Sequence, residues 1–206
     1  MKENIFTIIG GQIPLGQGFL ANGYFITAAH VLRDNDKYLV TIKGETIDLA
    51  KEVPVYIGSG NIYDPNCFDL AIFKFENVEG GLPVLDYTPI KDEVLESCCQ
   101  RIVNDDDRGK PLYELDVKLA FALGEEEGHY FHCKCFRKQG SSGSPLLKDN
   151  HVIGIMHGGK VVKELIEQGR LSEEEKQTFN LKDEDIICSF FKIGAFKTLI
   201  EKKENN

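Results

Sequence analysis

The sequence lacks any long hydrophobic run. From Asn4 to Leu32 there is no Asp, Glu, Lys or Arg, but glycines, a proline and polar side chains interrupt the stretch, so no apolar segment of about 18 residues exists to span a bilayer. A signal peptide would need a basic start, and here Lys2 is offset by Glu3. Buried strands explain the stretch better, and we expect an intracellular, cytoplasmic protein without a membrane partner.

Basic residues are also few. Lysine and arginine number 24 against 33 aspartates and glutamates, which gives a net charge of −9 at pH 7. No basic patch interleaved with aromatic residues is present, so the composition argues against a nucleic-acid partner. The acidic surface also disfavours acidic substrates at long range, although salt screens this effect beyond about 10 Å.

Widely spaced cysteine pairs, as in a secreted disulfide-bonded protein, are missing too. The six cysteines are Cys67, Cys98, Cys99, Cys133, Cys135 and Cys188. A zinc site built from His129, His132, Cys133 and Cys135 is one alternative. However, His132 falls on the opposite strand face from Cys133 and Cys135, and no second Cys-x-x-Cys element exists. We therefore predict reduced structural thiols, no metal and no other cofactor.

Short runs rich in β-branched and aromatic residues predict an all-β chain. In the first half they are 6–9, 19–20, 24–28, 38–43, 53–57 and 70–75. In the second half they are 96–102, 113–122, 130–136, 145–147, 152–156 and 186–191. Turn-forming clusters divide these runs, and many short strands at such spacing are typical of a sandwich or a barrel.

Three motifs carry catalytic chemistry. His30 ends the strand-like run Thr27-Ala28-Ala29-His30, Asp69 stands at the mouth of Phe68-Asp69-Leu70-Ala71-Ile72, and Ser142 lies within Gly140-Ser141-Ser142-Gly143-Ser144-Pro145. A serine hydroxyl needs an imidazole to take its proton, and the imidazole needs a carboxylate to fix its tautomer. The glycines permit a sharp turn, so that the amides of Gly140 and Ser142 can form an oxyanion hole. The pattern predicts a serine protease.

Each of the three residues has competitors. Ser141 and Ser144 flank the nucleophile, but the Gly-x-Ser-Gly-x-Pro register favours Ser142. Asp64 lies five residues before Asp69 and lacks the apolar residues that directly follow Asp69. The other four histidines lack the strand-end position of His30.

In this order the motifs resemble those of the chymotrypsin-like (trypsin-fold) serine proteases, and most of all the compact bacterial branch that includes the glutamyl endopeptidases. Val152–Gly159 resembles that group's strand with paired glycines, and Ile193–Glu201 resembles its closing helix. The resemblance implies one peptidase domain, 1–206, with two six-stranded antiparallel β-barrels at about 1–80 and 90–206, a C-terminal helix, and the active site between the barrels.

The resemblance also implies an endopeptidase that works through an acyl-enzyme on protein or peptide substrates. Animal trypsins carry an aspartate before the nucleophile to bind a freed N-terminus, but this chain has Ser141 there, so we expect activity without zymogen cleavage. The alternative is a catalytically idle trypsin-fold module that binds a partner.

Family geometry suggests seven substrate-binding residues: Phe136, Arg137, Gln139, Met156, His157, Gly158 and Gly159. Met156 stands where glutamyl endopeptidases carry their acid-reading histidine, and His157 is expected to buttress Asp69. Arg137 could select an acidic side chain or extend to solvent, whereas a floor of Phe136 and Met156 would prefer a hydrophobic one. The unpartnered charge of Arg137 favours the acidic preference narrowly.

The segment from Lys160 to Asp185 breaks the β pattern, with 8 acids and 5 bases among 26 residues. Val162, Leu165 and Ile166 keep helical spacing, and Ser172 precedes three glutamates as at a helix start. We expect a charged, partly helical insertion, which is either plain surface or a lid that binds a regulatory partner.

Overall fold

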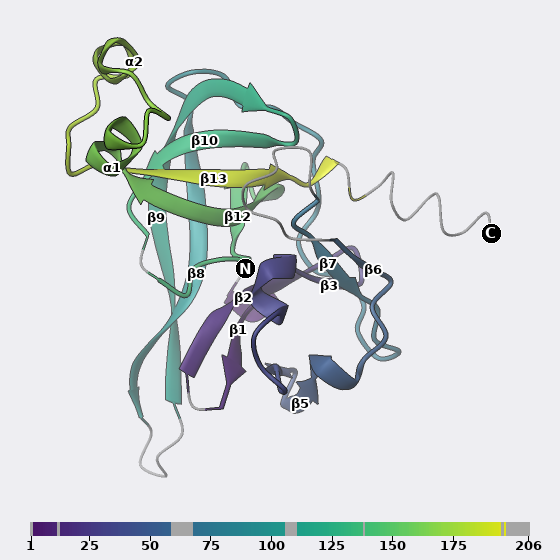
Figure 1. Cartoon of the computed structure of the whole chain (residues 1–206). Coiled ribbons are helices and arrows are strands. Elements are labelled where there is room, and N and C mark those ends of the chain that lie inside the picture. The colour runs from purple at the N-terminus through teal and green to yellow at the C-terminus, as the bar shows by residue number, and fades with distance from the viewer. Residues whose placement is uncertain are drawn as a thin grey trace.

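A computed structural model describes residues 2–11, 13–58, 68–105, 111–137, 139–194 and 196. It consists of two β-sheets that lie against each other, the first formed by the N-terminal half of the chain and the second by the C-terminal half (Figure 1). None of the helices in these ranges has the length and apolar composition needed to cross a membrane.

The first sheet contains seven strands in the order β5-β4-β1-β2-β3-β7-β6. Their bounds are β1 Ile5–Gly10, β2 Ile13–Ala21, β3 Tyr24–Thr27, β4 Leu39–Ile42, β5 Glu45–Asp48, β6 Tyr56–Ile57 and β7 Ala71–Phe73. All of the pairings are antiparallel, and three single-turn 3₁₀ helices accompany the strands: η1 Lys2–Asn4, η2 Ala29–Leu32 and η3 Leu49–Lys51. Among the described residues this sheet is a half-barrel that does not close.

The second sheet is a closed barrel in the order β10-β13-β12-β11-β8-β9. Its strands are β8 Val94–Asp105, β9 Pro111–Glu127, β10 Tyr130–Cys135, β11 Pro145–Lys148, β12 His151–Val161 and β13 Ile186–Lys192. The predicted mostly-β, two-sheet architecture is therefore confirmed. The expected count of six strands holds for the second half, and the first half differs because β5 adds a seventh, edge strand.

The larger apolar core fills the first half, with side chains such as Phe19 and Phe25, and continues into the barrel through Val152 and Phe191. A second core, which includes Phe190, lies within the barrel. The five described cysteines are all buried free thiols, which agrees with the expectation of reduced structural cysteines; Cys67 lies outside the described residues.

The charged insertion is partly helical, as predicted. It contains α1 Val162–Glu167 and α2 Glu173–Thr178, which lie together at one end of the barrel (Figure 1). Ser172 and Glu175 form a capping box at the start of α2. Apolar side chains of the insertion pack into a third small core with Leu123 of β9 and Ile187 of β13, so the insertion is fixed to the barrel.

Two sequence-based expectations fall on residues whose structure is not described. The closing helix expected at 193–201 lies largely outside the described residues, as does Asp64, the competitor of Asp69. Residues 79–89, which connect the two halves, contain no named strand and contact both halves through the isolated bridges Ala21↔Leu82 and Val84↔Val152.

Candidate active site

Strand pairing brings His30 and Asp69 together. In the first sheet Thr27 of β3 pairs with Ala71 of β7, so the end of one strand lies beside the start of the other. The chain turns directly after Thr27 into η2, which carries His30, and Asp69 lies two residues before β7. Two motifs that are 39 residues apart in sequence thus meet in space.

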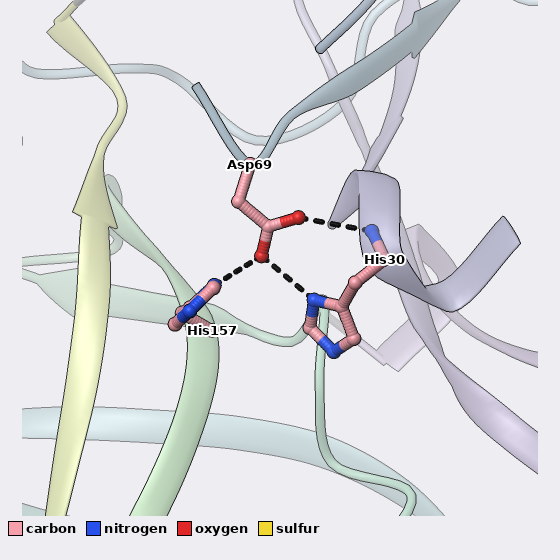
Figure 2. Close-up of side chains that lie close together, drawn as sticks. All are labelled: His30, Asp69 and His157. Carbon is pink, nitrogen blue, oxygen red and sulfur yellow. Dashed lines mark hydrogen bonds and ion pairs between the residues drawn. The ribbon is translucent and has the colours of Figure 1, made fainter. Parts of the chain in front are cut away.

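The carboxylate of Asp69 binds His30 through both of its oxygens (Figure 2). Oδ2 lies 2.7 Å from Nδ1 of the imidazole, and Oδ1 accepts the backbone N–H of His30 at 2.9 Å. This double contact fixes the ring's position. It also assigns the Nδ1 proton to the carboxylate side, which leaves Nε2 as the nitrogen that can take a proton.

His157 is a second imidazole on the same carboxylate. Its Nδ1 also contacts Oδ2 of Asp69, from the side opposite His30 (Figure 2). The pairing of β12 with β13 shifts register between Met156 and Gly158, so His157 is the extra residue of a β-bulge. Bulges turn side chains out of the regular alternation. Met156 points into the barrel core, whereas His157 reaches Asp69, as the sequence suggested.

Asp69 is ionised in this environment. Burial would raise its pKa, but the hydrogen bonds from His157 and His30 outweigh burial and hold the pKa well below its ordinary value. The side chain of Asp69 is fully buried, while that of His30 is 22% exposed. A charged, enclosed carboxylate therefore lies behind an imidazole that solvent can reach.

Ser142 lies beside the same residues. Its hydroxyl donates to the backbone carbonyl of His157 over 3.3 Å, so His157 contacts Asp69 with its side chain and Ser142 with its backbone. The flanking serines are buried and engaged elsewhere, Ser141 with Cys99 Sγ at 3.9 Å and Ser144 with Met156 Sδ at 3.8 Å. Of the three candidate serines, Ser142 is the one whose hydroxyl contacts a residue that binds Asp69.

The loop that carries Ser142 depends on two glycines. Gly140 and Gly143 both have φ of +83°, a left-handed conformation that side chains disfavour. A Cβ on Gly143 would also lie 2.1 Å from the carbonyl oxygen of Gln17. The Gly143 amide donates to Met156 O at 2.7 Å, whereas the amides of Gly140 and Ser142 donate to no acceptor within the described part of the chain. Those two amides remain available for a substrate oxygen.

Gln17, which the sequence analysis did not single out, holds this loop. Its backbone N–H donates to Ser142 O at 2.7 Å, and its side-chain Nε2 donates to Gly140 O at 3.3 Å. Its Oε1 accepts the backbone N–H of Gln100 in β8 at 2.9 Å. This buried side chain on β2 therefore links the first sheet, the serine loop and the barrel. No local pattern could have revealed these contacts, because they join residues more than 80 positions apart.

The arrangement agrees with a sequence comparison. Residues 16–155 match the model of the Trypsin-like peptidase domain family, and this range contains all three motifs. The chain belongs to the trypsin-like peptidase family. Family membership makes it a serine endopeptidase by class. No curated protein matches the sequence.

Solved structures show the same fold for this peptidase. Mouse neuropsin superimposes with a TM-score of 0.62 at 17% identity, covering 98% of this chain and 95% of neuropsin. The active form of the Mycobacterium tuberculosis Rv3671c protease gives 0.59 at 16% identity, covering 98% and 81%. A serine endoprotease from Yersinia pestis gives 0.57 at 19% identity, covering 98% and 62%. The narrower resemblance to glutamyl endopeptidases stays a prediction.

A pocket of about 380 Å³ opens next to Ser142 in this peptidase. Five of the seven predicted substrate-binding residues line it: Arg137, Gln139, Met156, Gly158 and Gly159. His157 instead lines a neighbouring pocket beside His30. Phe136 is 61% exposed and lines a different cavity, which shares Gln139 and Gly140 with the pocket beside Ser142. The expected pocket floor of Phe136 and Met156 therefore does not form.

Arg137 neither extends to solvent nor offers a free charge to the pocket. Its guanidinium is buried, with Nη1 3.1 Å from Oδ2 of Asp116 and Nε 2.9 Å from Ser97 Oγ. Nη2 donates to the backbone oxygens of Ser97 and Asp116. The expected extension of Arg137 to solvent is therefore wrong, and its selection of an acidic side chain stays a prediction. Its charge is neutralised by Asp116 across the β8–β9 hairpin, which removes the argument for an acidic pocket.

The zinc alternative does not form among the described residues. Cys133 and Cys135 lie in the barrel core, while His132 on the other face contacts Ser189 Oγ at 3.0 Å. In the described ranges, His30, Asp69 and His157 are the one group whose ligand atoms lie close enough for a metal ion. Both Nδ1 atoms contact Oδ2 of Asp69 directly, which is the arrangement of hydrogen-bond donors around an acceptor rather than of ligands around an ion.

Proposed function

We propose that this peptidase is catalytically active and that Ser142 is its nucleophile, His30 its general base and Asp69 the carboxylate that orients His30. The observation that carries the proposal is the buried Asp69 carboxylate, which holds Nδ1 of His30 at 2.7 Å while Ser142 lies within contact of the same cluster. An imidazole fixed in this way keeps Nε2 as the nitrogen that can accept the serine proton.

The reaction then follows from these atoms. The Ser142 hydroxyl turns from His157 O to Nε2 of His30, gives up its proton there, and adds to the substrate carbonyl carbon. The oxyanion binds the amides of Gly140 and Ser142. His30 passes the proton to the leaving amine as the C–N bond breaks. Water, deprotonated by His30, then attacks the acyl carbon, and His30 returns that proton to Ser142 Oγ as the ester C–O bond breaks.

The edge of β12 offers a template for the substrate backbone. Between Gly158 and Val161 the strand pairs with β13 on one side, whereas its other neighbour, β11, ends its pairing at Ile155. An extended peptide can add to this free edge as an antiparallel strand, with its carbonyl beside Ser142. The two glycines leave room for the peptide backbone to approach.

The pocket beside Ser142 favours an apolar side chain before the scissile bond. Met156, Val161 and Ile186 supply apolar wall, and the cation at Arg137 is already paired with Asp116. The other charged lining residues are Lys160, which donates to Gln168, and Glu164. Filling such a pocket is worth about 1–3 kcal/mol per well-fitted side chain. We therefore expect cleavage after hydrophobic residues, in place of the acidic preference that an unpaired Arg137 would have produced.

Activity without a freed N-terminus is part of the proposal. Ser141, at the position of the zymogen aspartate, packs against Cys99 and offers no carboxylate to an ammonium group. Ile5 and Ile8 of β1 are fully buried between β2 and β4, so trimming past them would remove core residues. An intracellular location remains our proposal as well, supported by the five buried free thiols.

The competing function is an idle binding module. The Ser142 hydroxyl contacts His157 O rather than His30, which is the observation in its favour. Catalytic hydrogen bonds are often absent before substrate arrives, so we favour the enzyme.

Hydrolysis by a Ser142→Ala variant tests the proposal. We expect kcat to fall by about 10⁴-fold or more, because the nucleophile is lost, while circular dichroism stays unchanged. Cleavage of a hydrophobic peptide library by the wild-type chain, read by mass spectrometry, gives the reference. Equal hydrolysis by wild type and variant would overturn the assignment, and no hydrolysis by either would support the binding module.

A further inference from the structure

A second pocket lies on the His30 side of the substrate edge. It measures about 200 Å³, and its lining combines His30, Gly158 and Gly159 with Leu165 and Arg170 from the charged insertion. The pocket beside Ser142 shares the two glycines and Lys160 with it. A peptide added along β12 would therefore pass both pockets, with one side chain in each.

Resting on the proposed function, we infer that this second pocket is a substrate subsite for an acidic side chain, located N-terminal to the scissile bond and read by Arg170. The pocket is walled by the apolar Leu165 and Ile187, and its two formal cations are Lys160 and Arg170. No aspartate or glutamate is among its lining residues in the described ranges.

The charge of Arg170 is available. Lys160 Nζ donates to Gln168 Oε1 at 2.8 Å, whereas Arg170 has no ion pair or side-chain hydrogen bond within the described residues. Of the acids on α1, Glu167 pairs with Lys163 at 3.9 Å. A carboxylate entering the pocket would thus meet a guanidinium without a competing partner, although the net charge of the whole molecule is −9.

The position of Arg170 is fixed by the turn that ends α1. Gly169 adopts φ of +65° and donates to Ile166 O at 2.9 Å, and the Arg170 amide donates to Leu165 O at 2.8 Å. These two bonds form a glycine-based helix stop. Val162, fully buried, anchors the same helix in the small core against Leu123 and Ile187. The insertion is therefore a preorganised wall of the cleft, and the Arg170 side chain extends from a backbone that these hydrogen bonds hold in place.

The experiment compares peptides that differ at a single position. In a fixed peptide with a hydrophobic residue before the scissile bond, each of the next three positions toward the N-terminus carries in turn Glu, Gln or Lys. For the full-length wild-type chain we expect Glu to exceed Gln in kcat/KM by about fivefold at one of these positions, which corresponds to a partly exposed ion pair. Arg170→Gln should abolish that preference, and Arg170→Glu should transfer it to Lys.

Lys163→Gln and Lys163→Glu are the matched controls, because Lys163 is a 68% exposed cation on the same insertion outside the pocket. Labelling of each variant with a fluorophosphonate separates the possible failures. If the wild type is labelled but it and both Arg170 variants have the same ratio of kcat/KM for the Glu and Gln peptides, the subsite is refuted and the proposed enzymatic function stands. The same conclusion follows if the Lys163 variants change this ratio as much as the Arg170 variants do. If the wild type is not labelled, the proposed function fails.

Discussion

Three residues around one carboxylate form the centre of this molecule. Asp69 accepts from His30 and His157 at once, and the carbonyl of His157 receives the Ser142 hydroxyl. Because the buried carboxylate is ionised and doubly bound, the imidazole of His30 has one orientation and one tautomer. The chemistry of the site is set by these contacts.

Replacing Asp69 with Asn tests the orienting role. We expect kcat to fall by about 10⁴-fold, because an amide at this position favours the wrong imidazole tautomer. Steady-state hydrolysis of a peptide that the wild type cleaves gives the measurement. A loss of less than about tenfold would contradict the role.

The lowered pKa of Asp69 makes the stability of the folded chain depend on pH in the acidic range. Its pKa is below the ordinary value in the folded state, so the unfolded chain binds a proton there first as the pH falls. The stability it contributes is complete above about pH 4 and is lost progressively at lower pH. Urea unfolding at several pH values should show this loss in the wild type. In Asp69→Asn the free energy of unfolding should fall less steeply at low pH, because this titrating carboxylate is missing. Equal pH dependence of the free energy of unfolding in wild type and variant would contradict the argument.

His157 is expected to act as a positioning residue through Asp69. His157→Ala removes one hydrogen bond to a buried charge, and the free energy of unfolding should decrease by about 2 kcal/mol. His157→Asn, which keeps a donor near the Nδ1 position, should restore part of both stability and kcat. Urea denaturation and kinetics on the same samples measure this, and equal behaviour of the two variants would rule out the hydrogen bond as the cause.

At the scale of elements, the strand ends and the serine loop place the catalytic groups. The β3–β7 register sets His30 beside Asp69, the bulge in β12 turns His157 toward them, and Gln17 on β2 holds the loop. Each of these devices joins distant parts of the chain.

Gln17→Ala should lower kcat by about tenfold or more with little change in KM, because the amides of Gly140 and Ser142 lose their fixed support. Gln177, an exposed glutamine on α2, provides the control as Gln177→Ala. The rates are compared in the same peptide assay. An unchanged kcat for Gln17→Ala would mean that the loop holds its shape without this side chain.

Arg137→Ala should act on stability rather than on specificity. Removing the guanidinium leaves the buried oxygens of Ser97 without a donor and takes one of two cations from Asp116, which keeps Lys118 at 3.5 Å. We expect the free energy of unfolding to decrease by about 3 kcal/mol. Arg101→Ala is the matched control, since its ion pair with Glu114 is exposed and 3.9 Å long. Urea denaturation measures both. A changed residue preference in a stably folded Arg137→Ala variant would contradict the structural role.

Much of the fold could be predicted because apolar and β-branched runs mark strands directly. Strand β5 was missed because Glu45–Asp48 is a polar edge strand, without the apolar run that marks the others. The three motif residues could be proposed because their chemistry needs particular residue types. Gln17 and the Arg137–Asp116 pair could not, since their roles depend on which strands become neighbours, and no local pattern encodes that.

At the scale of the whole molecule, the half-barrel supplies His30 and Asp69, and the barrel supplies Ser142 and the substrate edge. The insertion at 160–185 closes one side of the cleft next to His30. The regulatory partner expected there, the absence of a nucleic-acid partner and the cytoplasmic location stay predictions. The central claim needs all of these parts in one chain: an activated Ser142 in the uncleaved protein.

Fluorophosphonate labelling of the intact chain, followed by whole-protein and peptide mass spectrometry, tests that claim most directly. Only a serine activated by a correctly held imidazole reacts readily with this reagent. We predict a single adduct on the mass of the intact 206-residue chain, mapped to Ser142, and none in Ser142→Ala or His30→Ala. Labelling confined to a truncated species, an adduct at another serine, or an unreactive wild type would contradict the account.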